Sequence, residues 1–101
     1  MIIVTTDHIP SKEIKDIVGY VQGGTICKKN LGKDSSISFM MGGELNLFAE
    51  MLVEAKHVAL NHMANDAKRG GANAIIGLRV IQTPVMQGAI EIFVYGTGVV
   101  I

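Results

Sequence analysis

The chain has a single cysteine, Cys27, among its 101 residues, so no disulfide can form within it. It also has no excess of either charge, because nine basic and nine acidic residues give a formal net charge of +0. Proteins that bind nucleic acids usually carry a basic face. The densest basic group here is only Lys28, Lys29 and Lys33, and we therefore expect no nucleic-acid partner.

The sequence lacks an apolar run long enough to cross a membrane, which takes about 20 residues. The longest charge-free run near either end spans residues 92–101 and has the composition of a strand. The chain opens with apolar residues but turns polar at Thr5, without the basic and long apolar regions of a signal peptide. These features predict a cytoplasmic protein without a membrane partner.

Apolar residues, in contrast, are abundant. They make up 49% of the sequence, and the mean hydropathy is +0.37. The length predicts one domain over residues 1–101, and a domain of this size buries only roughly two-thirds of the surface that its unfolded chain exposes. The surplus apolar surface is therefore expected to be covered by self-association.

The clearest predicted element is a helix over residues 44–69, in which polar and apolar residues fall on opposite stripes of the helical wheel. The polar stripe comprises Asn46, Glu50, Glu54, His57, Asn61, Asn65 and Lys68, and the apolar stripe Leu45, Phe48, Leu52, Ala55, Ala59 and Met63. Gly70-Gly71 provides a helix stop. Such a helix is about 40 Å long, more than a small sheet needs for cover, so part of it is expected to meet another subunit.

Four strands are predicted from β-branched and apolar runs, over residues 2–6, 14–27, 74–83 and 89–101. Pro84 is expected to end the third strand, and Gln87-Gly88 to turn the chain into an antiparallel hairpin. Residues 28–43 are typical of a loop, with a short helical turn around Phe39-Met40-Met41.

The predicted fold class is therefore α+β, in the order β-β-α-β-β, with one long amphipathic helix packed on a curved, mainly antiparallel sheet. Gly96 and Gly98 indicate a bulge or close packing in the last strand. The last two strands are largely apolar on both faces, and one helix covers only one face of a sheet. The other face is expected to meet further subunits.

Several residues could bind a soft metal ion. They are Cys27, His8, His57, His62, Met40, Met41 and Met63. His57 and His62 are five residues apart and project about 140° from each other on a helix, so they would not share an ion within one subunit. A site could form between subunits from Cys27 and a methionine. The alternative is that Cys27 is a small buried apolar residue and the methionines fill gaps in the core.

Two pairs of residues on the predicted helix could take part in acid–base chemistry. His62 and Asp66 are four residues apart and lie on or beside the apolar stripe, where the wheel predicts burial, so they could form a base with its orienting partner. We favour the alternatives, which are a hydrogen-bonded pair that fixes the helix at an interface, or a frayed last turn of the helix that reaches solvent. Glu50 and Glu54 have the same spacing, but their polar stripe indicates a solvated face.

Three segments together resemble the YbjQ-like family, small bacterial and archaeal proteins also described as heavy-metal-binding. They are Thr5-Thr6, the segment Gly70-Gly71-Ala72-Asn73-Ala74-Ile75-Ile76-Gly77, and Phe93-Val94-Tyr95-Gly96-Thr97-Gly98-Val99. The resemblance implies an α+β fold with one long helix against a strongly curved sheet, and a ring-shaped homo-oligomer, a pentamer. It also implies a possible heavy-metal ion, although Asn73 stands where many relatives have an aspartate.

Three functions are compatible with these residues. The first is a homo-oligomeric binding or scaffold protein without catalysis, which holds a small ligand or ion at a subunit interface. The second is a soft-metal-binding protein that uses Cys27, methionines and histidines across subunits. The third is an enzyme that uses His62 and Asp66.

Overall fold

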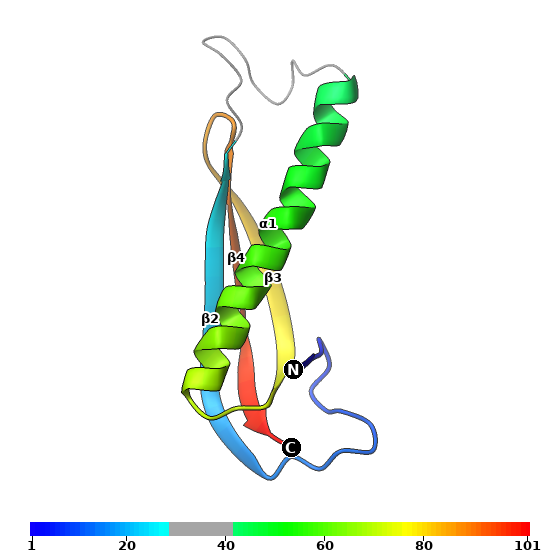
Figure 1. The fold of residues 1–101 in the computed structure, drawn as a ribbon, viewed down its shortest axis with the longest axis vertical. Helices are drawn as coiled ribbons and strands as arrows, with labels where there is room; N and C mark the ends of the chain where they lie inside the picture. Colours follow the sequence, from blue (N-terminus) through cyan, green and yellow to red (C-terminus); the bar gives the residue numbers. More distant parts are fainter. Residues whose placement is uncertain (29–41) are drawn as a thin grey trace.

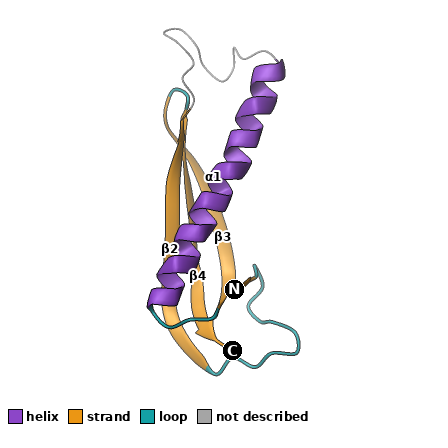
Figure 2. Cartoon of the chain, viewed as in Figure 1, coloured by secondary structure: helices purple, strands orange, loops and turns teal. Residues whose placement is uncertain are grey.

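The computed structural model describes residues 1–28 and 42–101, and the side chains of all of these except residues 42–46. The described chain forms four strands and one helix (Figures 1 and 2). The strands are β1 (Ile2–Ile3), β2 (Asp16–Lys28), β3 (Ala74–Met86) and β4 (Ala89–Val100), and the helix is α1 (Gly42–Arg69). The predicted α+β class is therefore confirmed.

The four strands form one open, mixed sheet in the order β1-β3-β4-β2. β4 lies between β3 and β2 and is antiparallel to both, whereas the short β1 pairs in parallel with the start of β3. β2 is thus an edge strand along its whole length. Beside β3, the N-terminal segment reaches only as far as Leu78, whose N–H donates to the carbonyl of Val4 at 3.1 Å.

Helix α1 covers one face of the sheet and crosses it obliquely (Figure 1). Its buried side chains pack on residues of β2 and β4 around the fully buried Met63. The two backbones come very near each other at Gly23 of β2, where a Cβ atom would lie within 3.0 Å of backbone atoms of Ala59 and Met63. This position therefore requires glycine for the helix and strand backbones to come so near each other.

The opposite face of the sheet carries no helix in the described part of the chain. Cross-strand partners share a face, so the register places Ile26, Tyr95 and Ile81 together on this face. Tyr20, Ile26 and Ile81 are 63%, 59% and 45% exposed. We call this surface the uncovered face.

Several predicted boundaries need correction. The third strand does not end at Pro84 but continues to Met86; this part of β3 lies at the edge of the described sheet, where a residue without an N–H is tolerated. The helix begins at Gly42 rather than at Glu44, and only Ile2–Ile3 of the first predicted run forms a strand. The helical turn predicted around Phe39-Met40-Met41 lies outside the described residues.

The glycines of β4 have the role of close packing. A Cβ atom on Gly96 would lie 2.9 Å from the side chain of Ile75, and one on Gly98 would lie 3.1 Å from Val21. The register shift in β2 lies instead between Ile17 and Gly19, and Gly19 has a φ of 126° that other residues rarely adopt.

We predict that Gly23→Ala lowers the free energy of unfolding by more than about 2 kcal/mol, because the added methyl group meets helix backbone that has no room to move aside. Chemical denaturation measures this change. Gly24→Ala is the matched control, since its Cβ atom would lie 3.2 Å from the carbonyl oxygen of Ile92 and should cost less. Equal losses for the two variants would contradict the predicted close contact.

Candidate functional site

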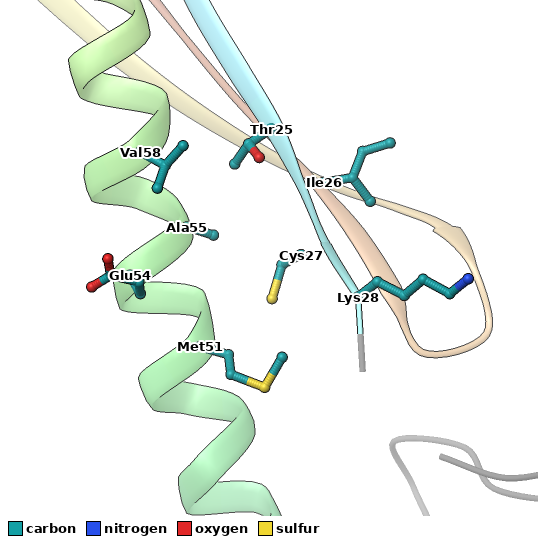
Figure 3. Close-up of a pocket in the computed structure, with 8 residues that line it drawn as sticks. All are labelled: Thr25, Ile26, Cys27, Lys28, Met51, Glu54, Ala55 and Val58. Carbon is teal, nitrogen blue, oxygen red and sulfur yellow. The ribbon is translucent and has the colours of Figure 1, made fainter. Parts of the chain in front are cut away.

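A cavity of about 300 Å³ lies between β2 and α1 (Figure 3). Its lining comes from these two elements alone: Thr25, Ile26, Cys27, Lys28, Met51, Glu54, Ala55 and Val58. The side chains of Cys27 and Met51 point into the space from opposite walls, whereas those of Ile26 and Lys28 point to the other side of the strand. The interior of the cavity is therefore mainly apolar, and its polar atoms are few.

The cavity exists because the helix and the strand separate. At Gly23 the two backbones are in contact, and side chains in the next turns of α1 toward its N-terminus are small, with Ala59 and Ala55 on the buried stripe. The oblique path of α1 then carries it away from β2 (Figure 1). Ala55 is too short to fill the widening gap opposite Cys27.

Cys27 lies in this cavity as a free thiol that is only 5% exposed. Burial raises its pKa above the ordinary value of a cysteine, because the thiolate loses hydration in an apolar environment. At neutral pH the group is therefore a protonated thiol. Among the non-hydrogen atoms that line the cavity, its sulfur and that of Met51 are the soft ligands.

The structure does not bring the predicted metal-binding residues together. His57 is exposed on α1, Met63 is buried in the core, and His8 lies near Asp7 in the N-terminal segment, with 3.0 Å between Nδ1 and Oδ1. Among the side chains that the structure describes, those of residues 1–28 and 47–101, no group of three or more His, Cys, Asp or Glu is placed to hold a metal ion. Met40 and Met41 lie outside the described residues.

His62 and Asp66 each form a hydrogen bond to the backbone of β2 and do not form the predicted pair of a base with its orienting partner. The Nδ1–H of His62 donates to the carbonyl of Gly24 at 2.9 Å, since a carbonyl only accepts. Oδ2 of Asp66 accepts from the N–H of Gln22 at 3.1 Å, and its Oδ1 accepts from Arg69 at 3.4 Å. The predicted burial was wrong: His62 is exposed and Asp66 is half-buried.

This arrangement follows from the path of the helix. α1 lies along the edge strand, so one flank of its apolar stripe faces the unpaired backbone groups of β2 rather than the core. The N–H and C=O groups of Gln22 and Gly24 point outward from β4, and an unpaired strand edge can attract another strand. His62 and Asp66 therefore close this part of the β2 edge.

Sequence reasoning missed Met51 as a partner for Cys27. A weak signal was present, because Met51 lies on the margin of the apolar stripe of the helix and Cys27 lies in a strand expected to pack beneath it. The pairing of one with the other depends on how far α1 has shifted along β2. The spacing of residues in the sequence carries no information on that shift.

A family model described as "Putative heavy-metal-binding", that of the YbjQ family, matches residues 1–101. The chain belongs to the YbjQ-like family. Its relatives include a UPF0145 protein of Clostridium perfringens, 45% identical over 102 residues that cover 99% of this chain and 96% of the relative. Another UPF0145 protein, from Clostridioides difficile, is 47% identical over 103 residues that cover 100% and 92%.

A solved structure shares the fold of this YbjQ-like chain. It is a protein of unknown function from Pediococcus pentosaceus, assigned to the DUF74 family, with a TM-score of 0.62 and 23% sequence identity. The match covers 100% of this chain and 97% of that one. At this identity the likeness concerns the fold alone. Within the described residues, α1 does not combine the length and apolarity of a membrane-spanning helix.

We predict that Asp66→Ala speeds hydrogen exchange at the Gln22 amide by about fivefold, because the variant removes an acceptor worth about 1 kcal/mol. Amide exchange followed by NMR measures the effect at this one residue. Asn65→Ala, at an exposed neighbouring position, is the control and should leave Gln22 unchanged. Unaltered exchange in the Asp66 variant would show that its carboxylate does not protect the β2 edge.

Proposed function

We propose that this protein is a homo-oligomeric binding or scaffold protein of the cytoplasm, which acts by assembly rather than by catalysis and holds a small ligand or ion between its subunits. The family description supports the ligand part of this proposal without specifying a site. The resemblance to the YbjQ-like family implies a ring of five subunits, and we adopt the pentamer as the expected assembly.

The observation that carries the proposal is the apolar surface of the single chain. Tyr20, Ile26 and Ile81 on the uncovered face are each between 45% and 63% exposed. The aromatic rings on this face already contact one another: the centroids of Tyr20 and Tyr95 are 6.2 Å apart, and those of Phe93 and Tyr95 are 5.9 Å apart. Contiguous apolar surface of this kind is characteristic of protein interfaces and binding grooves.

Apolar exposure also extends beyond the uncovered face. Residues 79–86 of β3 are exposed on both sides of the strand, including Val80, Val85 and Met86, and α1 exposes Leu47 and Val53. The exposed side chains thus belong to three different elements. Association through several of these surfaces would remove the apolar surplus that the composition already indicates.

Native mass spectrometry of the purified protein, without added metal, tests the proposal. We expect a mass five times that of the 10.8 kDa chain, since burial of the apolar surfaces drives assembly. An additional mass equal to a metal ion or a small molecule would identify the ligand. A bare monomer at micromolar concentration would refute the proposed assembly.

A second candidate function is soft-metal binding at the cavity. The observation that favours it is the placement of the Cys27 thiol and the Met51 thioether on opposite walls of one space (Figure 3). A thiolate and a thioether are ligands that copper(I) prefers. Glu54 also lines this cavity, but a carboxylate is a poor ligand for a soft ion, so further soft ligands would come from a second subunit.

For this second function, Cys27→Ser should abolish stoichiometric copper(I) binding, measured by competition with a chromophoric chelator. The raised pKa of Cys27 opposes loss of the proton that a metal must displace, so affinity should increase with pH until the thiol has titrated. Met51→Leu keeps the volume but removes the thioether and should weaken binding. Undiminished binding by the Cys27 variant would eliminate the site.

A further inference from the structure

The outer half of β3 is a strand edge with no backbone partner beyond β4 in the described chain. Backbone hydrogen bonds from the N-terminal segment reach β3 only as far as Leu78, and beyond it the side chain of Arg79 donates to the carbonyl of Thr5 at 3.1 Å. All residues of the segment 79–86 are exposed. Alternate backbone groups of such a segment point away from the sheet and are free to pair with another strand. Pro84 has no N–H, so the backbone N–H groups that this edge offers to another strand come from residues before Pro84.

The β2 edge on the other side of the sheet is closed in one part and open in another. His62 bonds to the outward carbonyl of Gly24, and Asp66 bonds to the outward N–H of Gln22. Outward and inward residues alternate along a strand, so Ile26 and Lys28 have their backbone groups on this outer side as well. No residue of the described chain bonds to them there, and the cavity beside Cys27 adjoins this open part.

We propose that β3 of one copy adds to the open part of β2 of the next copy and directs side chains into the β2–α1 cavity. This inference rests on the proposed homo-oligomer and names the surfaces that join its subunits. The two edges are different, so the contact is heterologous, and heterologous contacts are those that close into rings when the rotation permits. The occupant of the cavity is then a second copy of the chain.

The strand directions agree with this pairing. β3 and β2 are both antiparallel to β4, so they run parallel to each other within one chain. Rotation about an axis along the strands brings β2 of one copy and β3 of the next together in parallel. The sheet then continues between copies with every α1 on the same side, which cyclic symmetry requires of equivalent subunits.

The register places suitable side chains at the height of the cavity. Through β4, Gln82 lies level with Thr25, and Pro84 lies level with Cys27. Because cross-strand partners share a face, both side chains project on the helix side of the sheet, as does Val80, whose partner is the buried Val94. If β3 of the neighbouring copy pairs with β2 at this same height, without a shift along the strand axis, it presents Val80, Gln82 and Pro84 to the mouth of the cavity.

Variants on the two surfaces test the pairing when the wild-type oligomer has been established by native mass spectrometry. One variant, Val80→Glu with Gln82→Glu, charges the inserted strand; the other, Met51→Glu with Val58→Glu, charges the cavity. Each should be monomeric alone, and a mixture should give heterodimers, since each pair retains one intact copy of each surface. Asn61→Glu, at an exposed position on the polar stripe of α1 outside the cavity, should remain oligomeric.

Other outcomes separate this inference from the proposed function. A monomeric wild-type protein would remove both. A wild-type oligomer whose two variants still assemble would overturn only the strand pairing, as would an oligomer that the Asn61 variant alone disrupts. Circular dichroism of each variant establishes that the chain has folded.

Hydrogen exchange in the unmodified protein provides a measurement that does not depend on the variants. In the assembled wild type, all amides of residues 79–83 should be protected, whereas in a monomer alternate amides on the outer edge of β3 should exchange within seconds. The cavity variant leaves the β3 sequence intact and supplies that monomer for comparison. An intact wild-type oligomer with alternate amides unprotected would refute the pairing.

Discussion

The backbone contact between α1 and β2 at Gly23 determines much of the remaining structure. With glycine at this point, the helix lies directly on the strand near Ala59 and Met63, and its oblique axis then leads away from β2. On one side of the contact, His62 and Asp66 come within reach of the strand edge. On the other side the elements separate, and the cavity beside Cys27 opens.

The same contact explains why His62 and Asp66, whose spacing is typical of an acid–base pair, instead form hydrogen bonds to the backbone of β2. A histidine and an aspartate four residues apart on a helix are typical of a base and its partner, but these two side chains face an edge strand whose backbone groups lack partners. Hydrogen bonds to the backbone satisfy those groups. The pair consequently joins helix and strand, whereas the nearby cavity, with its thiol and thioether, is the place that we propose for another subunit or an ion.

The elements of the fold were largely predictable from local patterns. The separation of polar and apolar residues located α1, and the β-branched runs located β2, β3 and β4 to within a few residues. The errors arose where pairing between strands, rather than the local pattern, sets the boundary. Pro84 signals a strand end only if a partner needs its N–H, and whether β3 is an edge at that point depends on the order of strands. The length of β1 was overestimated because the segment beyond Ile3 bonds to β3 where the register of β3 shifts, between Ile76 and Arg79, and so forms no regular ladder.

The sequence by itself determined the α+β class, the long amphipathic helix and the excess of apolar residues, because each depends on composition and periodicity along the chain. The family membership follows from the sequence as well. Only the tertiary structure decided that Cys27 faces Met51 across a cavity, that His62 and Asp66 bind Gln22 and Gly24, and that β3 keeps an open edge. Those relations join residues distant in the chain, and they depend on strand order, register and the position of the helix, which local spacing does not encode.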